Sequence, residues 1–193
     1  VSAPLDTDAD GVYEIYTPAE LAYIIANFGT MDGVAGCSFI LMNDIYLNDI
    51  SKLDVVNGNG NAHNGWYRYA SNDSTGFAGT IDGNGHTVYG LYFNNTNTFG
   101  NYGHYGVGLV PAVKGEATVK NLKVDYCWMR YEGYASVFCG IGRSASTLNI
   151  VNCVAGANVH VYGYGVGAFR GNSYSMTTNI TNSYSLAGLH ANG

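Results

Sequence analysis

The sequence predicts an all-β fold, a right-handed parallel β-helix (β-solenoid) that begins with a short N-terminal capping helix. Three observations predict it: a repeat of about 30 residues, alternating apolar residues inside the repeat, and a Gly- and Tyr-rich composition. Only 11% of the 193 residues are charged, while 27 are Gly and 17 are Tyr. This composition favours short strands and tight turns, and the length suffices for one domain, 1–193, with a hydrophobic core.

The repeat is clearest in four related segments. They are TVYGLYF (87–93), TVKNLKV (118–124), LNIVNCVA (148–155) and TNITNSYS (178–185). When Gly90, Asn121, Asn152 and Asn182 are aligned, their spacings are 31, 31 and 30. Apolar residues alternate around these positions, which indicates strands with one inward face. Stacked strands lie about 4.8 Å apart, so we expect the asparagines to form a ladder.

A second family of strands shares this period. Its members are YGVGLV (105–110), YASVFC (134–139) and YGVGAF (164–169). Each period therefore contains at least two strands and no helical pattern. A single coil of this kind cannot bury its own apolar face, so the coils must stack. The crossover rule for parallel strands predicts a right-handed path.

The stretch GTIDGNGHTVYGL (79–91) places Asp82 and His86 four residues apart among glycines. The Asp-Gly-Asn-Gly run supplies the positive φ angles that a tight corner needs. We therefore interpret Asp82 as bonding turn amides and His86 as starting the next strand, rather than as a catalytic or metal-binding pair.

The N-terminal part departs from the repeat. Residues 1–37 read as a cap region with a helix at about 18–28, because Thr17 is an N-cap residue and Glu20 completes a capping box. Its apolar stripe comprises Leu21, Ile24, Ile25 and Phe28. Residues 38–47 predict a pair of strands, 48–76 a long loop insertion, and 77–193 the regular coils. The chain stops where another strand would begin, so we expect a longer protein or another chain at the C-terminal edge.

Two segments resemble known families. FAGTIDGNGHTVYGL (77–91) resembles the first coil of bacterial pectin-lyase-like β-helices, and VGAFRGN…NITNSYSLAG (166–188) resembles the GLUG repeat. Pro111 and the stretch VFCGIG (137–142) depart from that pattern. The resemblance implies a right-handed β-helix on an extracellular or cell-surface bacterial protein, often adhesive or attached to enzymes. It implies no shared catalytic residues.

Charge and cysteine usage exclude some partners. Residues 1–82 carry 11 acidic and 2 basic residues (−9), and residues 83–193 carry 3 acidic and 6 basic residues (+3). Neither half predicts nucleic-acid binding, and without an apolar run of about 18 residues we expect no membrane insertion. The four cysteines form no CxxC pair, so a zinc site is not expected, and their disulfide state stays open.

Carboxylates give little support for catalysis. Hydrolysis of glycans requires two facing carboxylates, yet residues 133–193 contain no Asp or Glu. A catalytic pair would have to come from the N-terminal part, in a cleft beneath the insertion. Asp6, Asp8 and Asp10 alternate as at the start of a calcium loop, but the expected Glu at loop position 12 is replaced by Thr17, for which Glu14 could partly substitute. The alternative to a calcium site is a solvated acidic linker.

Aromatic residues suggest a ligand surface, because aromatic faces pack on the C–H faces of sugar rings. The candidate contact residues are Trp66, Tyr67, Arg68, Tyr69, Trp128, Arg130, Tyr131 and Tyr162. Tyr131 and Tyr162 are 31 residues apart and are expected to stack. The sequence thus favours a non-catalytic carbohydrate-binding module that takes a polysaccharide or glycan. The alternatives are a protein-binding adhesin or stalk, and a polysaccharide lyase or glycoside hydrolase.

Overall fold

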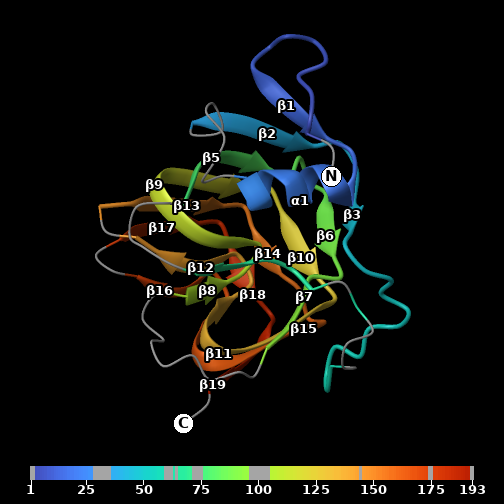
Figure 1. Cartoon of the computed structure of the whole chain (residues 1–193), viewed down its shortest axis with the longest axis vertical. Coiled ribbons are helices and arrows are strands. Elements are labelled where there is room, and N and C mark those ends of the chain that lie inside the picture. The colour runs from blue at the N-terminus through green and yellow to red at the C-terminus, as the bar shows by residue number, and fades with distance from the viewer. Residues whose placement is uncertain are drawn as a thin grey trace.

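The computed structural model is a parallel β-helix with one short helix, as the sequence predicted (Figure 1). It describes residues 3–27, 36–58, 63, 65–70, 76–95, 105–143, 145–173 and 176–191, and for 68–70 and 173 the backbone alone. Three sheets run along the stack of coils. Their named strands pair in parallel, except that β4 pairs antiparallel with β8.

Eight strands form the first sheet: β1 (Val12–Ile15), β2 (Cys37–Leu41), β5 (Phe77–Asp82), β9 (Val110–Lys120), β12 (Cys139–Gly142), β13 (Thr147–Val151), β16 (Arg170–Ser173) and β17 (Thr177–Thr181). Five form the second: β3 (Ile45–Tyr46), β6 (Thr87–Tyr89), β10 (Lys123–Asp125), β14 (Val154–Ala155) and β18 (Tyr184–Ser185). Six form the third: β4 (Arg68–Ala70), β7 (Tyr92–Asn95), β8 (Tyr105–Val107), β11 (Cys127–Ser136), β15 (Val159–Gly167) and β19 (Gly188–Ala191).

The helix α1 (Pro18–Asn27) follows β1 near the N-terminal end of the stack (Figure 1). Its capping box is confirmed: the Glu20 carboxylate accepts the Thr17 amide at 2.9 Å, and the Thr17 hydroxyl accepts the Glu20 amide at 3.3 Å. The predicted apolar stripe is buried at Leu21, Ile24 and Ile25, whereas Phe28 lies outside the described residues. These side chains join the main core, so the helix caps the hydrophobic interior of the first coils.

The asparagine ladder is confirmed between two coils. Asn152 Nδ2 donates to Asn121 Oδ1 at 3.0 Å, and Asn121 Nδ2 donates to Asp82 Oδ1 at 3.0 Å. Asn121, Asn152 and Asn182 all have positive φ, between 47° and 53°. Asparagine tolerates this left-handed conformation better than most residues, so each position serves both the turn and the ladder.

The predicted alignment of Gly90 with Asn121 is wrong. Val88 pairs with Val124, and Ile81 pairs with Val119, so the first coil is displaced relative to the sequence match. The similar openings TVY (87–89) and TVK (118–120) occupy different sheets, the second and the first. The reason is physical: both segments are an alternating strand that ends in a turn, and a solenoid coil contains several such units.

The turn after β5 has the predicted structural role. Asn84 and Gly85 have φ of 52° and 81°, and Asp82 Oδ1 accepts the Asn84 amide at 2.8 Å. His86 directly precedes β6, with Nδ1 3.3 Å from Asp44 Oδ1. These contacts hold a strand corner between neighbouring coils.

No disulfide joins the four cysteines, all of which lie in the described part of the chain. Cys127, Cys139 and Cys153 are buried in the core, where they act as small apolar side chains. Burial raises the pKa of Cys139 to about 12 and that of Cys153 to about 11, so both stay protonated at neutral pH.

Candidate functional site

A groove lies where the insertion meets the first coils. Three hollows, of about 230, 570 and 480 Å³, adjoin one another because they share lining residues at 47–48, at 63–67 and at Tyr92, and helix α1 lines the first of them. These volumes fall mostly within the range typical of small-ligand sites. The aromatic lining consists of Tyr46, Trp66, Tyr67, Tyr92 and Phe93, and the polar lining includes Asn48, Asp49, Lys52, His63, Asn94 and Asn95.

Backbone contacts fix the groove walls. Asn48 is buried and its Nδ2 donates to the Gly90 carbonyl at 2.8 Å. Gly90 has a φ of 77°, and a Cβ there would lie only 2.7 Å from the Asn48 amide nitrogen. Glycine is therefore required at this crossing, both for its conformation and for the close approach of the two chains.

Trp66 anchors the opposite wall. Its amide donates to the Tyr92 carbonyl at 2.7 Å, and its indole Nε1 donates to the Leu109 carbonyl at 3.1 Å. The neighbouring Tyr67 ring meets the Trp66 ring edge-on at 5.3 Å and remains 36% exposed. The buried tryptophan thus holds the exposed tyrosine at the rim of the groove.

Carboxylates are scarce in the described lining of the groove. Among the described lining residues, Asp49 is the one carboxylate. Hydrogen bonds from the Ser51 hydroxyl and the Lys52 ammonium lower the pKa of Asp49 to about 2. A glycosidase general acid needs a raised pKa and a second carboxylate facing it. The cleft beneath the insertion therefore lacks the converging carboxylates expected of an enzyme, within the part that is described.

Of the predicted contact residues, only some are available at the surface. Tyr67 is exposed and Arg130 is exposed, whereas Trp66, Trp128 and Tyr131 are 8%, 4% and 2% exposed. The expectation of open ring faces at these three positions is corrected: Trp66, itself part of the insertion, and Tyr131 join the main core, and Trp128 packs beneath Leu53 of the insertion. The prediction took polar neighbours in the sequence as a sign of solvent exposure. It was wrong because the insertion folds back over the strands.

The expected stacking of Tyr131 on Tyr162 is also corrected. Tyr162 pairs with Arg130 across the strands, and Tyr131 pairs with Gly163. The side chains of Tyr131 and Tyr162 consequently point to opposite faces of the sheet, as a one-residue offset requires. The side chains of Arg68 and Tyr69 lie outside the described residues, although their backbone forms β4.

Sequence reasoning missed Tyr46 and Tyr92. Tyr46 is 51% exposed and stacks on Tyr89 with ring centroids 4.7 Å apart. Tyr92 lies on β7, beside Trp128. Each tyrosine neighbours a buried apolar residue in its strand and could have been assigned to an outward face by alternation. Which outward faces meet the insertion could not be read from that pattern.

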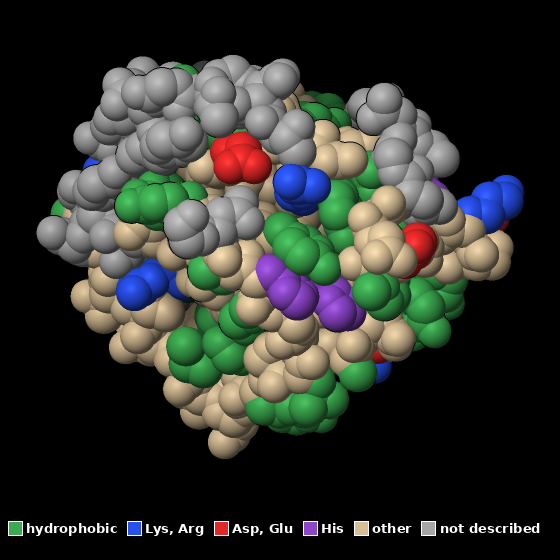
Figure 2. All heavy atoms as spheres, turned by 90° about the horizontal axis from the view of Figure 1, so that it is seen from below, with side chains coloured by type: hydrophobic (Ala, Val, Ile, Leu, Met, Phe, Trp, Pro, Cys, Tyr) green, Lys and Arg blue, Asp and Glu red, His purple; other side chains and the backbone are tan. Residues whose placement is uncertain are grey.

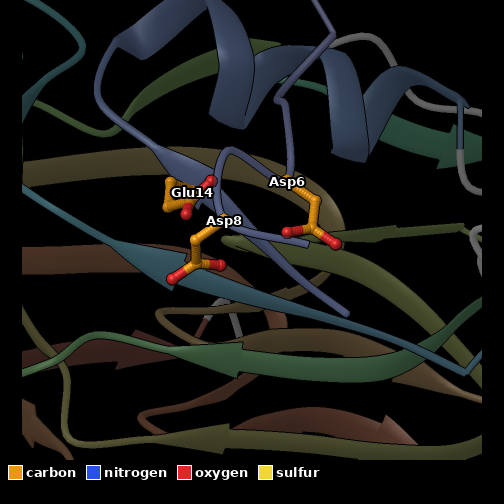
Figure 3. A group of neighbouring side chains, drawn as sticks. All are labelled: Asp6, Asp8 and Glu14. Carbon is orange, nitrogen blue, oxygen red and sulfur yellow. The ribbon is translucent and has the colours of Figure 1, made fainter. Parts of the chain in front are cut away.

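The acidic N-terminal loop forms a separate cluster. Oxygen atoms of Asp6, Asp8 and Glu14 lie within 4.8 Å of one another, and they come from the loop before β1 and from β1 itself (Figure 3). The Thr7 amide and hydroxyl each donate a hydrogen bond to the Glu14 carboxylate at 2.9 Å. The hydrogen bond from the Thr7 amide lowers the pKa of Glu14. Asp10, the third predicted ligand, instead accepts the Val12 amide at 2.8 Å. Calcium binding stays a prediction, with Glu14 in place of Asp10.

Comparison with known proteins gives no further assignment. No protein-family model, curated protein or solved structure matches the chain significantly. Within the described residues, no helix has the length and hydropathy needed to cross a bilayer.

Proposed function

We propose that this chain is a non-catalytic carbohydrate-binding β-helix whose ligand lies in the groove between the insertion and the first coils. The observation that carries the proposal is the lining itself, in which the exposed rings of Tyr46 and Tyr67 lie among amide and charged side chains. Aromatic faces suit the C–H faces of sugars, and amides suit their hydroxyl groups. A polysaccharide is therefore the ligand class that fits this mixture best.

The electrostatics of the groove support binding over cleavage. Asp49 is ionised at neutral pH, as its lowered pKa ensures even in moderately acidic solution, so it accepts hydrogen bonds there rather than donating a proton. Paired with Lys52 at 3.0 Å, it contributes little net charge. A ligand rich in hydroxyl groups matches such a site.

The test is a binding screen by affinity gel electrophoresis and calorimetry against xylan, β-glucan and polygalacturonate, with parallel assays for reducing ends and unsaturated products. Tyr67→Ala and Tyr46→Ala should each weaken binding roughly tenfold, because a contact aromatic contributes about 1–2 kcal/mol. Tyr184→Ala is the matched control, because Tyr184 is 57% exposed on β18 and lines none of the hollows. Equal binding by all three variants would contradict the proposal, and so would release of product.

A further inference from the structure

A row of stacked rings crosses the outer face of the third sheet. Tyr92 and Trp128 stack with centroids 5.5 Å apart and planes 22° apart, and Trp128 meets Tyr162 at 5.8 Å and 43°. Tyr162 then stacks on His190 at 4.2 Å and 9°. We call Tyr92, Trp128, Tyr162 and His190 the ring platform. It joins four strands, β7, β11, β15 and β19.

The two ends of the ring platform differ in accessibility. His190 is exposed and Tyr162 is half-buried, whereas Tyr92 and Trp128 are buried. Figure 2, the view from below, shows histidine side chains side by side with hydrophobic side chains on this face, and His160 stacks on His190 at 5.5 Å. At its other end the platform reaches the proposed groove, because Tyr92 also lines two of the hollows.

Residues 50–58 cover the middle of the platform, and we call them the strap. Leu53 is buried against Tyr92 and Trp128, and Val55 packs on the same cluster. Tyr162 Oη donates to the Val56 carbonyl at 2.9 Å. At the end of the strap, the Gly58 backbone lies so close to Trp128 that a Cβ on Gly58 would overlap the indole ring.

The strap holds its own shape through local bonds. Asp54 Oδ1 accepts the Val56 and Asn57 amides at 3.0 and 2.9 Å, and the Gly58 amide donates to the Asp54 carbonyl at 2.8 Å. All of these bonds lie within residues 54–58 and none involves the strands beneath. Beneath the strap, by contrast, the buried Trp128 Nε1 has no hydrogen-bond partner in the described structure. A buried donor without a partner costs free energy, so it offsets part of the stabilisation that the strap gains from its apolar contacts with the platform.

We infer that the strap is a movable cover and that the ring platform beneath it is a second polysaccharide-binding surface, continuous with the groove through Tyr92. This inference rests on the proposed function, since the ligand is the same chain extended beyond the groove. Opening the strap would expose a row of ring faces across neighbouring coils and free the Trp128 indole N–H to donate to a sugar hydroxyl. Arg130, exposed on β11, pairs with Tyr162 and adds a donor beside the row.

The decisive variant is Gly58→Ala, whose new methyl group must displace the strap from Trp128. Gly85→Ala is the matched control, because Gly85 also has positive φ (81° against 66°) but nothing within 4 Å of a Cβ. In a Trp66→Phe background Trp128 is the single tryptophan. Acrylamide quenching of its fluorescence then reports strap opening without any ligand. We expect acrylamide to quench Trp128 more strongly in Gly58→Ala than in the Trp66→Phe parent. Quenching in Gly85→Ala should equal that in the parent.

Binding is measured in the Trp66-containing proteins, with the polysaccharide retained in the screen and with its di- and trisaccharides. We expect Gly58→Ala to bind the polysaccharide at least about fivefold more tightly and the short sugars unchanged, since displacing a packed segment raises the open population. Tyr162→Phe removes only the hydrogen bond to Val56. It should increase both the quenching of Trp128 and the affinity for the polysaccharide, each by a smaller factor than Gly58→Ala does.

Unchanged quenching in Gly58→Ala would overturn the movable strap. Increased quenching with unchanged affinity for the polysaccharide would overturn the second surface. Failure of the proposed function looks different: no variant, nor the parent protein, would bind either the short sugars or the polysaccharide.

Discussion

The coils at 115–191 and the N-terminal part of the β-helix at 3–95 share one architecture but differ in regularity. In the later coils Val119, Ile150 and Ile180 stack in one ladder with unbroken register. In the earlier coils a helix, an insertion and an antiparallel strand interrupt the stack. The comparison teaches that regular ladders stabilise a solenoid, whereas interruptions create concave surfaces. The groove and the strap both belong to the interrupted part.

The largest expected effect tests how much stacking on both sides matters. Ile150 is fully buried between two coils, whereas Ile180, in the same ladder, is 50% exposed. Ile150→Ala should lower the free energy of unfolding by about 2–5 kcal/mol, because it leaves a cavity. Ile180→Ala should cost about 1 kcal/mol or less. Urea unfolding measures both, and equal losses would show that the last coil is covered in solution.

A second prediction separates the two roles of the ladder asparagines. Asn121→Ala removes two side-chain hydrogen bonds and leaves at a φ of 53° an alanine, which tolerates the left-handed conformation less well than asparagine, so it should cost about 2–3 kcal/mol. Asn121→Gly keeps the turn conformation and should cost about half as much. Thermal unfolding of the two variants measures the difference. If the glycine variant is as destabilised as the alanine variant, the ladder bonds rather than the turn dominate.

These two predictions also mark what could be predicted from the sequence. Positions such as Asn121, Asn152 and Ile150 could be predicted because a solenoid repeats one environment every coil. The helix could be predicted because Thr17 and Glu20 form a local capping box. The displaced pairing of Val88 with Val124 could not, because identical alternation occurs in more than one strand of each coil.

The site was only partly predictable for a related reason. The insertion was expected to carry Trp66 and Tyr67, and both line the groove. Whether a ring faces solvent depends on where the insertion folds, which involves contacts between residues as distant as Val56 and Tyr162. Local periodicity carries no information on such contacts, so Trp128 was expected at the surface and is instead covered.

A third prediction uses a charged pair in the regular coils. Burial alone would raise the pKa of Asp125, but the Lys123 ammonium at 2.8 Å and the amides of Tyr126 and Asn158 outweigh it and leave the pKa lowered. Because the pKa of Asp125 is lower in the folded than in the unfolded protein, its charge stabilises the fold at pH values above the unfolded-state pKa. This stabilisation is lost as the pH falls through the folded-state pKa. Asp125→Asn should therefore cost about 1 kcal/mol at pH 7.

The measurement is chemical unfolding of both proteins across pH. The difference between wild type and Asp125→Asn should be constant near neutrality and shrink below about pH 4, where unfolded aspartates take up protons. A difference that stays constant down to the acid limit would mean that packing, not the carboxylate charge, accounts for the loss.

The smallest expected effect concerns the acidic loop in the interrupted part and decides between two ligand sets. The sequence pattern predicts Asp6, Asp8 and Asp10, whereas the structure groups Asp6, Asp8 and Glu14. If calcium binds as the structural grouping requires, millimolar calcium should raise the melting temperature of wild type by about 2–4 °C, which corresponds to about 1 kcal/mol. Asp8→Asn should abolish the rise and Asp10→Asn should retain it. Loss of the rise in Asp10→Asn would restore the sequence-based ligand set, and no rise in wild type would leave the loop a solvated acidic turn whose carboxylates serve the backbone amides around them.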